Sequence, residues 1–115
     1  MDTAFEVTIG AEYAVYGVTV WRGHCWYYVF DDDDLAYPVW KPAALFEVSD
    51  PTMPRNWVFG YVQPVDGDGG QGFPVISFPE WALDRYFYEH LVDGDRLARA
   101  AFDRNRAEAE RVTSK

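Results

Sequence analysis

The side chains best suited to nucleophilic or metal chemistry are few: one cysteine, Cys25, and two histidines, His24 and His90. A cysteine–histidine nucleophile pair needs both side chains in one cleft within hydrogen-bonding reach. His24 and Cys25 are neighbours in a strand-like segment, where adjacent side chains point to opposite faces. They therefore do not form such a pair by themselves, and nothing in the sequence pairs Cys25 with His90. One cysteine and two histidines are also too few for a closed structural zinc site.

Carboxylates are plentiful, but their spacing does not match a known site. The run of residues 31–34 is four aspartates, whose side chains alternate in direction on an extended chain and cannot all face one ion. Asp66 begins a stretch that resembles an EF-hand calcium loop, yet Gln71 occupies its sixth position and Ser77 its twelfth. The glycine-rich stretch 64–72 lacks the Lys-Ser or Lys-Thr of a phosphate loop. We predict no metal, no cofactor and no enzymatic activity, and we assign no catalytic residue.

The charge of the chain is concentrated in its first part. Residues 1–80 carry 12 acidic and three basic side chains, and residues 81–115 carry seven of each, so the net charge of −9 falls entirely in the first part. Such a charge argues against a nucleic-acid-binding protein of the usual basic kind. It also provides a field that can steer a basic partner.

Composition excludes two further classes. The chain is 49% hydrophobic and 18% aromatic, whereas intrinsically disordered proteins contain few aromatic residues. No apolar run approaches the roughly 18 residues of a membrane span. The sequence contains no basic segment followed by an apolar one, so no secretory signal is expected. Its single cysteine cannot form an internal disulfide. We expect a cytoplasmic protein that binds neither nucleic acid nor membranes.

The first 76 residues have the pattern of strands. Alternation predicts a strand over 5–9, and composition predicts a hairpin formed by 13–21 and 24–30 around Arg22-Gly23. The four prolines of residues 35–55 predict an irregular extended segment, with a short strand at 45–48. Further strands are predicted at 57–63, where Gly60 marks a bulge, and at 73–76. The clearest loop is 64–72.

The pattern then changes to helices. Ser77 and Glu80 have the spacing of a capping box, with Pro79 in the first turn, and predict a helix over 78–91. Gly94 is expected to end that helix and Asp95 to cap a second one over 96–111. The buried stripe of the second helix is predicted at Leu97, Ala98, Ala101 and Phe102, with a frayed tail beyond Asn105.

Strands first and helices last predict an α+β fold. We expect a twisted antiparallel sheet from the N-terminal two-thirds, with two C-terminal helices packed on one face. The whole chain, 1–115, is predicted to be a single domain, strand-rich over 5–76 and helical over 78–111.

Aromatic residues beside the acidic run suggest a binding surface. Trp40 lies in the proline-rich segment and Trp57 just beyond it, and tryptophan is enriched at interface hot spots. Alternatively, Trp21, Trp26 and Trp81 form the core and these two residues close its ends. The predicted partner-binding residues are Asp31, Asp32, Asp33, Asp34, Trp40 and Trp57, with Asp66 and Asp68 as secondary contacts.

In size, acidity, aromatic content and the segment from Trp40-Lys41-Pro42 to Trp57, the chain resembles the small acidic immunity proteins that protect bacteria from nuclease or deaminase toxins. The resemblance is one of class and assigns no individual residue. It implies a non-enzymatic protein that neutralises a basic partner, such as a toxin or nuclease, by occluding its active or nucleic-acid-binding surface. A DNA-mimic inhibitor, in which carboxylates stand in for phosphates, is a close variant.

Two other classes of function remain alternatives. One is a structural or accessory module, phage or cytosolic, that self-associates through its aromatic residues, with the lone Cys25 and the broad apolar helix 78–91 permitting a homodimer. The other is a small-ligand-binding domain with an aromatic-lined pocket. For the binding protein, replacing aspartates 31–34 by asparagine is expected to leave folding intact and to slow association with the partner.

Overall fold

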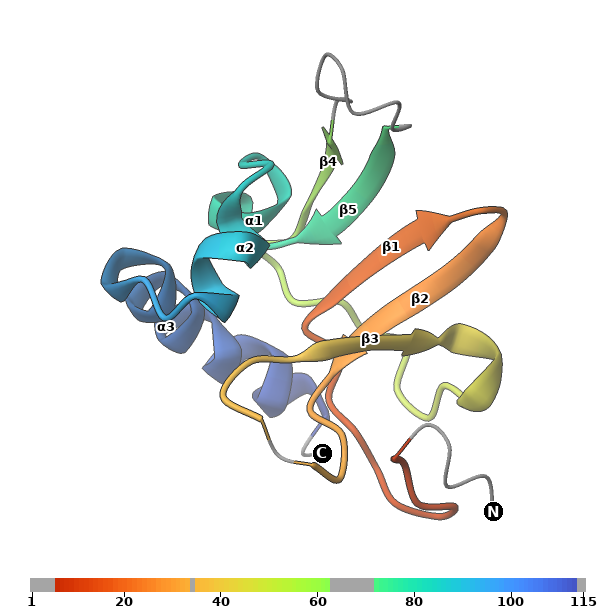
Figure 1. The fold of residues 1–115 in the computed structure, drawn as a ribbon. Coiled ribbons are helices and arrows are strands. Elements are labelled where there is room, and N and C mark those ends of the chain that lie inside the picture. Colours follow the sequence, from red (N-terminus) through yellow and green to blue (C-terminus); the bar gives the residue numbers. More distant parts are fainter. Residues whose placement is uncertain (1–5, 34, 63–71, 114–115) are drawn as a thin grey trace.

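The computed structural model describes residues 6–33, 35–62 and 72–113, with side chains described as far as residue 110. Within these residues, five antiparallel strands form one sheet, and three helices follow the last strand (Figure 1). This confirms the predicted α+β class, with the C-terminal helix packed against the sheet. The elements are β1 (Gly17–Trp21), β2 (His24–Val29), β3 (Val39–Pro42), the 3-10 turn η2 (Ala43–Leu45), β4 (Val58–Val62), β5 (Phe73–Ser77), α1 (Pro79–Ala82), α2 (Phe87–Val92) and α3 (Arg96–Thr113).

The strand order is β3-β2-β1-β5-β4. The chain therefore builds a three-stranded meander, crosses to the far edge of the sheet at β4, and returns through β5 to pair with β1. The connection that makes the crossing, residues 46–57, runs across the sheet, and Figure 1 shows it passing behind β2 and β1 on its way to β4. This crossing builds the site described below.

The predicted hairpin between β1 and β2 is confirmed. Trp21 pairs with His24, so the loop has two residues, Arg22 and Gly23. Both have positive φ (52° and 79°), as a type I′ turn requires. The strand predicted over 5–9 is wrong for the described residues 6–9, because the backbone turns at Glu6 (φ 52°) and the Ala11 amide donates to the Thr8 carbonyl.

The proline-rich segment contains a strand, but in a different place from the one predicted. Residues 39–42 form β3 and pair with β2, whereas 46–48 have no strand structure. Pro38 and Pro42 lack amide hydrogens, but the three residues between them keep theirs for pairing. Pro42 then begins η2, which ends the strand.

Strands β4 and β5 lie where the sequence predicted them, but Gly60 is not a bulge. It pairs regularly with Val75. A Cβ atom at residue 60 would lie 1.7 Å from the carbonyl oxygen of Ala82 in α1. The glycine is therefore required by the close approach of α1 to β4.

The predicted helix over 78–91 is interrupted. It forms two short helices, α1 and α2, because the Asp84 carboxylate accepts a hydrogen bond from the Tyr86 amide (2.9 Å) and competes with helical bonding. The predicted Ser77 cap is wrong, because Ser77 ends β5 and its hydroxyl donates to the Tyr16 carbonyl (2.7 Å). Pro79 occupies the first turn, as predicted.

The boundary between α2 and α3 agrees with the prediction. Gly94 has φ 82°, its amide donates to the Leu91 carbonyl, and the Asp95 amide donates to the His90 carbonyl, which together form a Schellman motif. The Asp95 carboxylate accepts from the Ala98 amide (2.9 Å) and caps α3.

Helix α3 continues past Asn105, where the sequence predicted fraying. Ala109 is buried, and the Tyr16 hydroxyl donates to the Glu110 carboxylate (2.6 Å), which also pairs with Arg106. Of the predicted buried stripe, Ala98, Ala101 and Phe102 are buried, but Leu97 lies beside the stripe and is 81% exposed.

The helices cover one face of the sheet, which we call the helix face; the opposite side is the open face. On the helix face, Tyr28 packs edge-on against Trp81 (ring centroids 4.8 Å apart), and Phe102 is fully buried. Burial raises the pKa of the Tyr28 hydroxyl to about 12. The buried aromatic residues of this core are Tyr16, Tyr28, Phe78, Trp81, Phe87 and Phe102.

Candidate functional site: a groove on the open face

The acidic run is not a uniformly solvated segment. The Asp31 side chain is only 4% exposed, and its carboxylate lies 3.0 Å from the ammonium of Lys41, which is itself 11% exposed. The same ammonium lies 3.5 Å from Glu6. The prediction that all four aspartates face a partner is therefore wrong for Asp31, because the antiparallel pairing of β2 and β3 places Lys41 next to it. Asp34 lies outside the described residues.

Asp32 and Asp33 also make contacts within the chain. The Asp32 carboxylate accepts hydrogen bonds from the hydroxyls of Thr8 (2.6 Å) and Tyr13 (2.7 Å), and these bonds hold its pKa below the ordinary value. The Asp32 amide donates to the Glu6 carbonyl. The Asp33 amide donates to the Asp31 carboxylate (3.1 Å). Hydrogen bonds to the acidic run thus hold residues 6–13 in place.

The acidic run also brings three carboxylates close together. Glu6, Asp31 and Asp33 place oxygen atoms within 4.8 Å of one another. The Lys41 ammonium pairs with two of these groups, so a cation of the chain itself already offsets their charge. This cluster therefore forms part of the fold and gives no argument for a bound ion.

The two predicted tryptophans lie apart. Trp40 is on the edge strand β3, on the helix face, and is 40% exposed. Its ring is tilted by 31° against that of Trp26, with the ring centroids 4.7 Å apart. Trp57 precedes β4, packs partly against the core and lines a groove on the open face. The structure does not bring Trp40 and Trp57 into one surface, and Asp66 and Asp68 lie outside the described residues.

The residues suited to nucleophilic chemistry are also separate. His24 and Cys25 are exposed at the start of β2, next to the hairpin tip, and His90 is on α2, stacked with Tyr86. Figure 1 shows the hairpin tip pointing away from α2. The described part of the chain therefore does not join Cys25 and His90 in one site.

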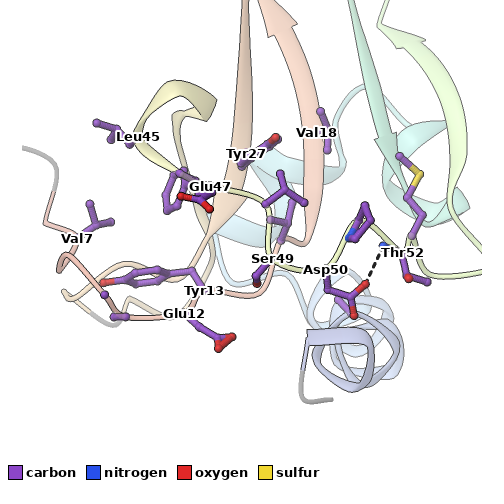
Figure 2. Close-up of a pocket in the computed structure, with 18 of the residues that line it drawn as sticks. Val7, Glu12, Tyr13, Val18, Tyr27, Leu45, Glu47, Ser49, Asp50 and Thr52 are labelled. Atoms are coloured by element: carbon purple, nitrogen blue, oxygen red, sulfur yellow. Dashed lines mark hydrogen bonds between the residues drawn. The ribbon is translucent and has the colours of Figure 1, made fainter.

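A groove of about 620 Å³ lies on the open face. Val18 of β1 and Tyr27 of β2 contribute side chains from the sheet. Residues 7–13 form one wall, and 45–54 form the other, with Trp57 and Ala109 also in the lining. In Figure 2 the second wall runs in front of β1 and β2. The groove is thus assembled from segments far apart in sequence.

The groove has a one-signed charge. Three carboxylates line it, from Glu12, Glu47 and Asp50, and the described lining contains no lysine, arginine, histidine or cysteine. Figure 2 shows Glu12 beside Tyr13 at one end, Glu47 nearer the middle, and Asp50 toward the other end. The Asp50 carboxylate accepts a hydrogen bond from the Thr52 amide (3.0 Å), which shapes that end.

The open face carries a row of apolar residues that extends from the groove to β4. Pairing places Phe59, Ile76, Val18 and Tyr27 in one row across β4, β5, β1 and β2. Tyr61 and Val20 lie two residues further along their strands, on the same face. Phe59 is 66% exposed, Tyr61 52% and Val20 44%. An antiparallel sheet with one solvated face normally carries polar residues there, so the exposure of Phe59, Tyr61 and Val20 needs another explanation.

Sequence patterns predicted little of this site. Of the predicted binding residues that the structure describes, only Trp57 lines the groove. One signal was available: in both β1 and β4, the residues of alternate positions Val18, Val20, Phe59 and Tyr61 are apolar, although the intervening positions face the core. The carboxylates of Glu12, Glu47 and Asp50 carried no signal, because their positions depend on how the two irregular segments cross the sheet.

No helix within the described residues is both long and apolar enough to cross a membrane. Comparisons of the chain with protein-family models, with curated proteins and with solved structures found no match.

Proposed function

We propose that the protein is a non-enzymatic, acidic binding protein that neutralises a basic protein partner, such as a toxin or nuclease, by occluding its active or nucleic-acid-binding surface. The open face is the docking surface. The observation that carries the proposal is the group of exposed apolar residues Phe59, Tyr61 and Val20 beside a groove whose described lining includes the carboxylates of Glu12 and Glu47 and no basic side chain.

The surface has the composition of a protein–protein interface. Exposed contiguous apolar patches on small proteins commonly mark interaction sites. Interfaces bury an apolar centre within a polar rim, and here Phe59, Ile76 and Val18 provide the centre while Glu12 and Glu47 provide polar groups at the groove. Burial of these apolar side chains against the partner drives association, and the carboxylates favour a partner of positive charge.

Charge selects a basic partner over a second copy of the chain. A homodimer through the open face would bring the carboxylates of two identical grooves toward one another, and like charges brought together across an interface disfavour binding. The net charge of −9 adds to this repulsion. The same charge accelerates the encounter with a basic protein, most strongly at low salt.

A small-ligand-binding domain is the second candidate. A volume of about 620 Å³ falls in the range of small-molecule sites, which are mostly apolar with a few polar groups. Small-ligand binding would leave the exposed apolar residues outside the groove, Phe59, Tyr61 and Val20, without a role. For that reason we favour the protein partner.

The test is affinity capture from the native cell lysate with three matched baits. They are the unmodified protein, Glu47→Lys in the groove, and Asp103→Lys on the exposed side of α3, which changes the net charge equally. We expect one basic protein, recovered at about a 1:1 ratio, that is retained by the unmodified and Asp103→Lys baits and lost from the Glu47→Lys bait and at raised salt. If no captured basic protein distinguishes the two variants, the proposed docking surface is wrong.

A further inference from the structure

We propose that the groove receives an arginine side chain of the partner, held between aromatic rings and carboxylates. This inference rests on the proposed function and names the group that the open face recognises. It follows from the ring geometry of the groove together with its charge.

Four aromatic residues from three segments line the groove: Tyr13 before β1, Tyr27 of β2, and Phe46 and Trp57 at the two ends of the connection between η2 and β4. Phe46 lies between two of the others. Its ring centroid is 6.0 Å from that of Tyr13, in an edge arrangement, and 5.9 Å from that of Tyr27. These rings therefore form a connected aromatic wall that faces the groove from both the sheet and the N-terminal segment.

Aromatic rings and carboxylates together favour a cation. A cation over a ring face is attracted by the negative face of the π system, and nearby carboxylates add Coulombic attraction. Glu12 and Glu47 place carboxylates in this groove, and the described part of its lining contains no basic side chain. Elsewhere on the same face, the acidic cluster of Asp31 and Glu6 has Lys41 as its own counter-cation. In this inference the guanidinium of the partner is the counter-cation of Glu12 and Glu47.

Arginine fits this combination better than lysine. The guanidinium is planar, stacks on aromatic faces, is weakly hydrated and donates in a fork that matches a carboxylate. Lysine is a compact and strongly hydrated charge that loses more hydration free energy on entering an aromatic groove. Arginine is also enriched among interface hot spots.

The wall is held in place before a ligand binds. The Tyr13 hydroxyl donates to Asp32 and accepts from the Thr8 amide (2.8 Å), so the orientation of this ring is fixed from its far end. A site ordered in advance loses less conformational entropy on binding. The acidic run thus acts on the groove as a support for its wall.

The experiment is an NMR titration of the intact protein with four peptide probes. Three are capped Gly-Xaa-Gly peptides, in which Xaa is arginine, lysine or citrulline; citrulline has nearly the shape of arginine without its charge. The fourth is a longer peptide of alternating leucine and lysine. We expect the arginine peptide to shift the signals of Tyr27, Phe46 and Trp57 and to bind about fivefold more tightly than the citrulline peptide. The lysine peptide is expected to fall between them.

Two variants locate the effect. Glu47→Gln is expected to reduce the arginine-over-citrulline preference, whereas Asp103→Asn on α3 is expected to leave it unchanged. Phe46→Leu keeps an apolar side chain but removes the central ring, and is expected to reduce the preference further.

The outcomes separate this inference from the proposed function. Equal affinity for the arginine and citrulline peptides overturns the arginine site. If the leucine–lysine peptide still binds the open face in that case, the proposed function stands. If the leucine–lysine peptide does not bind the open face, the proposed docking function is overturned.

Discussion

The two faces of the sheet are built from alternate residues of the same strands, yet one is covered by helices and the other is partly exposed to solvent. On the helix face, Thr19, Tyr28 and Val75 are buried beneath aromatic side chains from the helices. On the open face, Val18, Ile76 and Phe59 lie in a row whose end is exposed to solvent. Both faces carry several apolar residues, such as Val75 on the helix face and Val18 on the open face, so apolar content alone does not distinguish them. The difference lies in what the rest of the chain places over each face.

The helix face is covered by regular structure, whereas the open face is crossed by irregular segments. The helices supply large rings, such as Trp81 and Phe102, that fill the space against the strands. Residues 7–13 and 45–54 supply smaller and more polar side chains and leave a groove between them. One face therefore provides the stability of the fold, and the other offers surface for binding.

The largest expected contrast compares a phenylalanine from each face. Phe102→Ala removes a ring that contacts Tyr16, Phe30 and Phe78, and is expected to destabilise the protein by about 3–5 kcal/mol. Phe59→Ala removes an exposed ring and is expected to change the free energy of unfolding by about 0.5 kcal/mol or less. Urea unfolding measures both. Similar losses for the two variants would mean that the open face also stabilises the fold.

The second contrast divides the acidic run. Asp31→Asn leaves Lys41 without its closest carboxylate and is expected to cost about 3 kcal/mol, as for other buried ion pairs from which one partner is removed. Asp33→Asn keeps its backbone bond to Asp31 and is expected to have little effect. The fourfold asparagine variant is therefore expected to be destabilised, contrary to the expectation from sequence. Thermal unfolding compares them, and equal stability of the two single variants would contradict the buried pair.

The third contrast lies within the helix face. Gly60→Ala places a Cβ atom against the Ala82 carbonyl oxygen, so α1 must shift, and we expect a cost of about 1–3 kcal/mol. At Gly17 a Cβ atom would meet Ser77, Trp81 and Tyr28 at ordinary contact distances of 3.5 Å. Gly17→Ala is therefore the matched control. Equal tolerance of both substitutions in a denaturant titration would show that α1 does not press on β4.

The smallest expected effect concerns the groove wall and pH. Hydrogen bonds from Thr8 and Tyr13 lower the pKa of Asp32, so their stabilising contribution is complete above its ordinary pKa of 3.8 and is lost as the pH falls through the lowered value. Removing both donors with Thr8→Val and Tyr13→Phe is expected to move the Asp32 pKa up toward 3.8. NMR titration of the Asp32 carboxyl carbon measures this change. An unchanged pKa in the double variant would mean that these hydroxyls do not bind the carboxylate in solution.

Local patterns predicted much of the fold. The β1–β2 hairpin, β4, β5, the Gly94 stop and the Asp95 cap were all identified, because each depends on residues within a few positions of one another. The errors arose where a distant contact outweighed a local preference. Ser77 matched a capping box, but its hydroxyl binds Tyr16, which is 61 residues away.

The candidate site was much less predictable. Trp57 was identified, but Asp31 is paired internally, and Trp40 lies on the other face of the sheet. A run of aspartates is expected to be solvated only if no cation is near. The pairing of β2 with β3 brings Lys41 to Asp31. Whether a tryptophan faces the core or a groove depends on the register and on what crosses its strand.

The sequence by itself determined the acidity of the chain, its α+β class and the turns and caps made by neighbouring residues, because charge is additive and short-range backbone preferences act without the rest of the fold. Only the tertiary structure decided which apolar face of the sheet is covered, which carboxylates are paired and where the groove lies. These properties depend on contacts between segments tens of residues apart, whose positions are set by strand order and by the packing of the helices.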